Sequence, residues 1–126
     1  MPRRLPICPA PTQDIRLNIA NRQKAIDSAH YGPANPRLDN AKFWSSLAKR
    51  WGIDVTDART MLCGNCAAFD VTPEMIDCIR TGLMQGNNLD AGDVVVRAEL
   101  GYCRMFNFKC AASRTCSAWV VGGPIR

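Results

Sequence analysis

The sequence predicts a small, irregular, α-rich α+β domain with several short helices, little strand and an extended N-terminal arm. Its 126 residues suffice for one domain with a modest core. Apolar residues recur at helical spacing along much of the chain, whereas one short run of valines has the composition of a strand. We therefore expect an arm over residues 1–12 and a single domain over 13–126, with a helical, basic part (13–62) and a cysteine-rich part (63–126).

The arm is predicted from its prolines, Pro2, Pro6, Pro9 and Pro11, which remove backbone donors and block regular structure. The pair Arg3-Arg4 resembles the start of an export signal, but no apolar stretch follows it. We therefore expect no signal peptide and synthesis in a reducing cytoplasm, where clustered cysteines hold metal more often than they form disulfides.

Two helices are expected in the basic part. The first starts at Asp14, a capping residue, carries Ile15, Ile19 and Ile26 at near-helical spacing, and stops after Tyr31 at Gly32-Pro33. The second is capped by Asp39 or Asn40 and ends at Gly52. Its apolar stripe is expected to face the core and consists of Phe43, Trp44, Leu47, Ala48 and Trp51.

The cysteine-rich part is expected to follow a short helix over residues 56–61. A further helix is predicted from Thr72, with Pro73 at its first position, to about Gly82. Residues 86–88, Gly-Asn-Asn, are predicted to form a loop, and Val94–Val96 a strand.

Charge is unevenly distributed. Residues 1–62 hold ten Lys and Arg against five Asp and Glu, and residues 63–126 hold six against six, so the net charge of +5 lies in the first part. These charges are dispersed along expected helix faces, which is typical of solvated surface rather than of a nucleic-acid site. No apolar run reaches the roughly 18 residues of a membrane span.

The most informative pattern is a set of four thiols. Cys63-Gly-Asn-Cys66 is followed by Cys103 and Cys116, each near aromatic residues. Such a set indicates a metal or iron–sulfur site. Zinc modules usually present two close cysteine or histidine pairs, so the spacing leaves zinc as an alternative and favours an iron–sulfur cluster. Residues available for a water-excluding shell are Phe69, Met105, Phe106, Phe108 and Trp119.

The stretches Cys63–Phe69, Gly101–Phe106 and Cys116–Trp119 resemble the cluster-binding half of high-potential iron–sulfur proteins, over residues 61–121. The resemblance implies a [4Fe–4S] cluster in a shell of Phe69, Phe106, Trp119 and Tyr31. The chain departs from that family in a longer gap between the second and third ligands and in the lack of an export signal. The ligands implied by the resemblance are Cys63, Cys66, Cys103 and Cys116.

The whole chain also resembles small proteins encoded by tailed bacteriophages, through Asn21–Ile26, Tyr31–Pro36, Phe43-Trp44 and Cys110–Cys116. This resemblance implies a virion structural protein, made in the host cytoplasm and present in several copies beside other virion proteins. The cluster is then expected to act as a structural staple. A small one-electron carrier and a structural zinc protein are the alternatives.

The other cysteines and the lone histidine have simpler interpretations. Cys78 is expected to be a buried small hydrophobe and Cys8 a free thiol, while Cys110 is an alternative to Cys103 or Cys116 as a ligand. His30 is expected to cap a helix or face solvent. Because the chain has no catalytic motif and no partner set for His30, we expect a protein that is not an enzyme.

Overall fold

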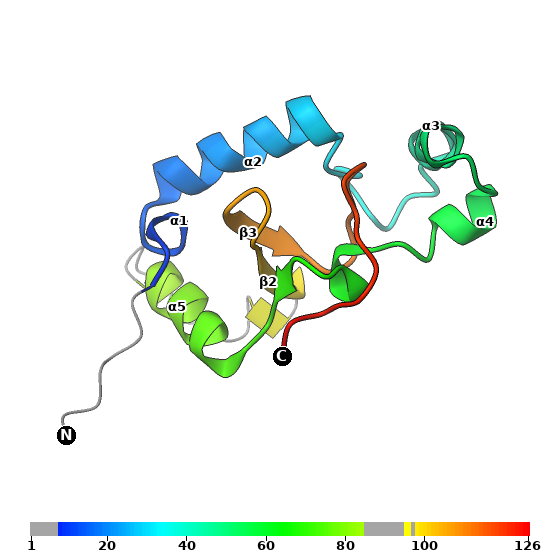
Figure 1. Ribbon diagram of the computed structural model, residues 1–126. Helices are drawn as coiled ribbons and strands as arrows, with labels where there is room; N and C mark the ends of the chain where they lie inside the picture. The colour runs from blue at the N-terminus through cyan, green and yellow to red at the C-terminus, as the bar shows by residue number, and fades with distance from the viewer. Residues whose placement is uncertain (1–7, 85–94, 97) are drawn as a thin grey trace, which may run out of the picture.

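The computed structural model describes residues 8–84, 95–96 and 98–126. It confirms a small, helix-rich α+β fold in which three of the helices pack beside a three-stranded antiparallel sheet (Figure 1). In chain order the elements are α1 (Ala10–Gln13), α2 (Ile15–Ala29), α3 (Ala41–Trp51), α4 (Val55–Ala58), the 3₁₀ turn η1 (Cys63–Asn65), β1 (Phe69–Asp70), α5 (Pro73–Met84), β2 (Leu100–Cys103) and β3 (Phe108–Ala111).

The sheet has the order β1-β2-β3 and carries Cys103 in β2 and Cys110 in β3. Cys103 pairs with Phe69 of β1 on one side and with Phe108 of β3 on the other. Helix α2 lies along the outer edge of β3 (Figure 1). There the Asn18 side chain accepts from Lys109 N at 2.7 Å, so the helix partly caps an otherwise open sheet edge.

Helix α2 begins as predicted and ends earlier. Asp14 Oδ1 accepts from the backbone N–H groups of Arg16 and Leu17, which confirms the predicted cap. The helix stops at Ala29 because His30 adopts the left-handed conformation, with φ 55°. His30 is thus the C-terminal cap. Ile15 and Ile19 are exposed. The buried residues of α2 are instead small or polar, namely Asn18, Ala25 and Ala29.

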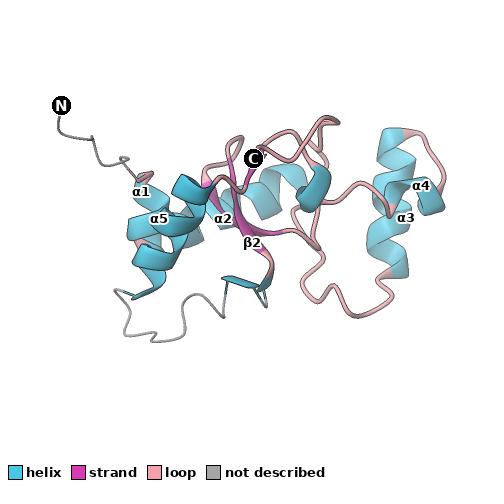
Figure 2. Cartoon of the chain, turned by 90° about the horizontal axis from the view of Figure 1, so that it is seen from below, coloured by secondary structure: helices cyan, strands magenta, loops and turns pink. Residues whose placement is uncertain are grey.

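Helices α3 and α4 form a lobe at one end of the molecule, away from α1 and α5 (Figure 2). As predicted, Gly52 ends α3 with φ 70°, and the apolar stripe of the helix is core. Asn40 is at the predicted cap position, but its side chain makes no cap hydrogen bond and donates to Asn35 O and Leu38 O instead. Helix α4 covers residues 55–58 rather than the expected 56–61. The lobe has its own apolar cluster, whose buried members are Trp44, Leu47, Ala48 and Ala58.

The prediction of an extended arm over residues 1–12 is wrong for residues 10–12, which belong to α1. Residues 1–7 lie outside the described part. Pro11 occupies the first turn of α1, where a missing N–H costs nothing, and Pro11 and Thr12 are buried. Cys8 is bonded to Cys78 of α5, and the Gln13 side chain donates to Cys78 O at 2.8 Å. The segment is therefore held against α5.

The predicted strand Val94–Val96 is not a strand where the structure describes it. Val95 and Val96 are helical, and Val94 lies outside the described residues, as does the loop predicted over 86–88. Val95 is buried beside α5 residues Met75 and Ile79 while Val96 is exposed, so one valine packs against a helix and no ladder forms. Helix α5 itself starts at Pro73 as predicted and continues two residues past Gly82.

Candidate metal centre

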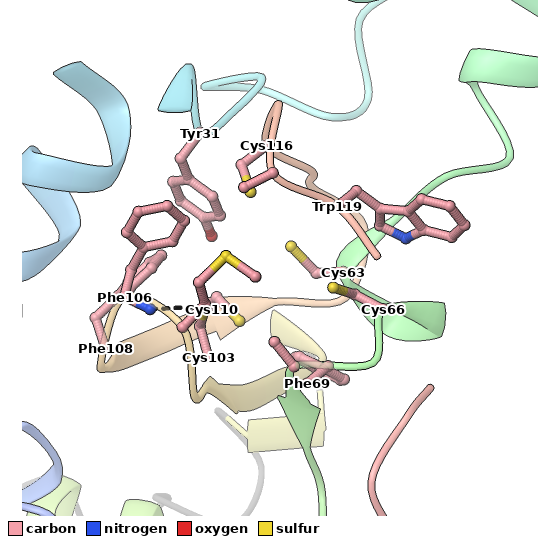
Figure 3. A pocket seen from close by; sticks show the side chains of 13 residues that line it. Tyr31, Cys63, Cys66, Phe69, Cys103, Phe106, Phe108, Cys110, Cys116 and Trp119 are labelled. Atoms are coloured by element: carbon pink, nitrogen blue, oxygen red, sulfur yellow. Dashed lines mark hydrogen bonds between the residues drawn. The ribbon is translucent and has the colours of Figure 1, made fainter. Parts of the chain in front are cut away.

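Five free thiols surround one pocket in the middle of the molecule. Cys63 begins η1, Cys66 directly follows it, Cys103 comes from β2, Cys110 from β3 and Cys116 from the segment after β3. Figure 3 shows these side chains around the pocket, with Tyr31 and Phe69 on opposite sides of it. The structure thus brings together the four cysteines that the sequence selected and adds Cys110 to them.

Cys63 and Cys66 are positioned by a tight 3₁₀ turn that is bonded to the segment after β3. Cys63 N donates to Arg114 O at 2.6 Å, and Cys66 N donates to Cys63 O at 2.9 Å. The Asn65 side chain holds the turn, because its Oδ1 accepts from Leu62 N at 3.1 Å. Cys66 then leaves the turn in an extended conformation and bridges to Val121. The CxxC spacing thereby places both thiols beside the pocket.

Cys103 lies at the end of β2, immediately before the hairpin turn to β3. Phe106 N donates to Cys103 Sγ at 3.4 Å, and Asn107 N donates to Cys103 O at 2.8 Å. Asn107 closes the turn in the left-handed conformation, with φ 56°. The hairpin therefore directs a backbone N–H at the Cys103 sulfur, an arrangement that stabilises a metal-bound thiolate.

Cys116 lies in a segment without regular structure that is bonded on both sides. Thr115 and Gly32 exchange two backbone hydrogen bonds, at 2.7 and 3.0 Å, and Ser117 N donates to Ala29 O at 2.7 Å. The backbone N–H of Ala118 interacts with the Cys116 sulfur. The backbone around Cys116 is therefore fixed, as it is around Cys103.

The aromatic residues expected to form a shell lie around the pocket. Tyr31, Phe69, Phe106 and Trp119 all line the pocket, together with Met105 and Phe108. The Tyr31 ring packs edge-on against Phe108 at 4.8 Å between centroids. About 380 Å³ of atom-free space, part of it open to solvent, lies between these side chains. The surroundings of the thiols are thus apolar and largely shielded from water.

Gly101 is required for this shell, because the Phe69 ring packs directly onto it. A Cβ at position 101 would overlap the ring carbons of Phe69. Gly101 pairs with Cys110 across β2 and β3, and Phe69 is 4% exposed. The glycine therefore leaves room for the ring that forms one wall of the pocket.

Burial controls the protonation of the thiols. It raises the pKa of Cys116 to about 12, opposed in part by the Ala118 N–H and reinforced by the neighbouring thiols. Burial also raises the pKa of Cys103, and it raises the pKa of Cys110 well above the usual range, with a further contribution from a hydrogen bond to Cys63. Burial thus disfavours the thiolate form at all three positions.

The five thiols are spread around the lining of the pocket. In the described ranges, no three His, Cys, Asp or Glu side chains are placed to hold one metal ion. Tetrahedral zinc with Zn–S bonds near 2.3 Å would require sulfurs roughly 3.8 Å apart. A cubane cluster binds each thiolate to a different iron and therefore accepts a wider ring.

The second group of cysteines corrects the sequence-based interpretation. Cys78, expected to be an unpaired hydrophobe, and Cys8, expected to be free, form a disulfide with 5.4 Å between their Cα atoms. Cys78 is buried as expected, in the apolar cluster with Met75 and Ile79. The 70 residues that separate the two positions give no local signal of pairing, which is why the sequence did not indicate it. By contrast, the alternation Phe108-Lys109-Cys110 is a strand pattern that could have placed Cys110 at the pocket.

Comparisons with protein-family models, curated proteins and solved structures find no match to this chain. Its function is therefore argued from its own residues. None of the helices in the described part is long and apolar enough to cross a membrane.

Proposed function

We propose that the thiol pocket binds a [4Fe–4S] cluster through Cys63, Cys66, Cys103 and Cys116. The observation that carries this proposal is the convergence of these thiols, from three separate parts of the chain, on one apolar pocket with aromatic walls. The Phe106 N–H group, which donates to the Cys103 sulfur at 3.4 Å, supports the choice of Cys103 as a ligand.

Cys110 is the thiol left outside this ligand set. Its sulfur interacts with the Cys63 side chain, and its pKa is raised mainly by complete burial. It lies in β3, opposite Gly101, whereas Cys103 ends β2 and Cys116 lies outside regular secondary structure. Cys110 therefore fits a neutral thiol beside the cluster better than a ligand.

The cluster would act as a structural staple. Four bonds would join η1, the end of β2 and the segment around Cys116, which has no regular secondary structure. A polynuclear metal centre in such a position contributes to folding in the way that structural zinc does. The resemblance to phage-encoded proteins, which rests on sequence alone, supports a non-enzymatic role in a virion, with the protein made in the host cytoplasm and placed among other virion proteins.

One observation favours a second function, that of a small electron carrier. Cys103 and Cys116 are only half-buried, and Met105, which lines the pocket, is 44% exposed. Val120 and Val121 add exposed apolar surface on the segment that follows Cys116. A cluster held here would lie close to the protein surface, as exchange of electrons with a partner requires.

The deciding experiment measures iron, sulfide and zinc in anaerobically purified protein, together with its visible absorption. We expect four iron and four sulfide per chain and a brown chromophore. One equivalent of zinc without sulfide would instead establish the zinc alternative. Removal of iron should unfold the cysteine-rich part if the cluster is a staple. A reversible electrochemical wave with no loss of structure on iron removal would instead establish the carrier.

A further inference from the structure

A second cavity, of about 410 Å³, shares no lining residue with the thiol pocket. Three segments meet at it: residues 35–37, residues 98–99 just before β2, and residues 111–114 from the end of β3. Its volume is in the range of small-molecule sites. Because residues 35, 37 and 99 are exposed, the cavity opens to solvent. Its polar lining residues are Asn35, Arg37, Glu99, Ser113 and Arg114.

Arg114 is held in place at this cavity. The central carbon of its guanidinium lies 5.7 Å from the centre of the buried Tyr31 ring, and Nη2 donates to Ala34 O at 3.2 Å. Stacking on an aromatic face, together with a hydrogen bond, restricts the orientation of a guanidinium. Arg114 therefore has little further freedom to lose when it binds a ligand.

The Arg114 guanidinium also has donors without partners. Within the described residues its one hydrogen bond is the bond to Ala34 O, and its Nε is buried with no hydrogen-bond partner. It makes no ion pair with a carboxylate in that part of the chain. Buried donors are normally satisfied, so an acceptor that reaches this guanidinium is favoured. The charge of Arg114 is thus available to a ligand.

Arg37 brings a second guanidinium to the cavity, again without an ion-pair partner among the described side chains. The lining therefore holds two positive charges against the one negative charge of Glu99. Ser113 adds a hydroxyl group. Asn35 Oδ1 accepts from Arg37 N at 3.1 Å, which leaves the Asn35 amide nitrogen as a further donor. Guanidiniums recognise phosphate well because their planar forks can bind two of its oxygens at once.

We propose that this cavity binds the phosphate group of a small molecule. Arg37 and Arg114 hold the phosphate oxygens, and the Ser113 hydroxyl donates to them. The Glu99 carboxylate repels a bare phosphate ion at short range and accepts instead from an amino or hydroxyl group elsewhere on the ligand. The ligand class is therefore a small phosphate monoester that carries such a group. This site does not depend on the metal centre proposed above.

The first test is isothermal titration calorimetry with phosphoethanolamine, inorganic phosphate and ethanolamine at constant ionic strength. We expect wild-type protein to bind one phosphoethanolamine per chain, more tightly than inorganic phosphate, and not to bind ethanolamine. Arg37→Gln and Arg114→Gln should each weaken binding of phosphoethanolamine by about tenfold or more, because each removes charge-assisted hydrogen bonds. Should Arg114→Gln fail to fold, Arg37→Gln still decides, because Arg37 lies on an exposed turn.

Arg50→Gln is the matched control, because Arg50 is an exposed arginine in the last turn of α3, outside the cavity. It removes the same charge and should change the affinity by less than about twofold, since salt screens distant charges. Equal effects of Arg37→Gln and Arg50→Gln would show attraction to net charge alone and would overturn the proposal. Absence of saturable binding by either phosphate compound would overturn it as well.

Glu99→Gln tests the ligand class. Loss of the carboxylate charge should tighten binding of inorganic phosphate and weaken binding of phosphoethanolamine, so that the difference between the two compounds shrinks. If wild-type protein binds inorganic phosphate more tightly than phosphoethanolamine, or if Glu99→Gln changes both affinities equally, the assignment of a phosphate monoester is wrong.

Discussion

The Arg104 guanidinium donates two hydrogen bonds to one oxygen of Asp70, from Nε at 2.9 Å and from Nη2 at 2.6 Å. Asp70 ends β1 and is 1% exposed, while Arg104 directly follows the pocket cysteine of β2. Arg104 N also donates to Ala68 O at 2.8 Å. This contact therefore fixes the strand end that carries Cys103 against the segment that follows Cys66.

Replacement of Arg104 should lower stability in a pH-dependent way. Burial alone would raise the pKa of Asp70, but hydrogen bonds from Thr72 and Arg104 lower it overall. The ionised Asp70 therefore stabilises the fold above its unfolded pKa of roughly 3.9, and this contribution is lost as the pH falls through the lower folded pKa. We expect Arg104→Gln to lower the free energy of unfolding by about 1–3 kcal/mol at pH 7. The difference between the variant and wild type should narrow below about pH 4.

The measurement is urea unfolding followed by circular dichroism at several pH values. Arg80→Gln is the matched control, because Arg80 makes an exposed ion pair with Asp77 at 3.5 Å, and such pairs contribute little. If Arg104→Gln and Arg80→Gln have equal effects at pH 7, the role assigned to the Asp70 contact is wrong.

The proposed ligand set predicts a contrast between two serine variants. Cys103→Ser removes a ligand and should abolish the brown chromophore and most of the bound iron. Cys78→Ser should leave both, because Cys78 belongs to the apolar cluster around α5 and does not line the pocket. Iron analysis and visible absorption of the two purified proteins check this. Loss of the chromophore in Cys78→Ser, together with its retention in Cys103→Ser, would contradict the proposed ligand set.

Loss of the Cys8–Cys78 disulfide should destabilise the protein only under oxidising conditions. The bond closes a loop over a sequence separation of 70 residues, for which the chain-entropy model gives roughly 4 kcal/mol, usually an upper figure. We expect Cys8→Ser to be about 2–4 kcal/mol less stable than oxidised wild type. In dithiothreitol the two proteins should unfold at the same urea concentration. A difference that persists in the reductant would show that Cys8 stabilises the fold by packing.

Gly101→Ala should disturb the pocket through Phe69. The added methyl group would overlap the Phe69 ring, and overpacking of this kind costs about 1–3 kcal/mol. Because that ring forms a wall of the pocket, retention of iron during gel filtration should fall as well. The double variant Gly101→Ala with Phe69→Leu removes the overlap and should recover part of the stability. Full stability of Gly101→Ala alone would show that the ring can move aside freely.

Local signals in the sequence predicted much of the fold. Asp14 and Gly52 mark the start of α2 and the end of α3 because capping depends on nearby residues alone. The strand prediction for Val95 is wrong because a β-branched residue suits either a strand or a position packed against a helix. Only the position of α5 in the fold decides between these two environments. Sequence spacing brought four cysteines into one hypothesis. It could not show that Cys8 meets Cys78, since that pairing depends on the packing of α1 against α5.

Two tryptophans are hydrogen-bonded to the segments that carry the pocket cysteines. Trp51 Nε1 donates to Ser117 O at 3.0 Å, next to Cys116, and Trp119 Nε1 donates to Leu62 O at 2.9 Å, next to Cys63. Trp44 is buried in the lobe of α3 and α4 instead. The protein thus contains its own fluorescent probes: a change in tryptophan emission would report in real time a change in the order of the segments that carry Cys63 and Cys116.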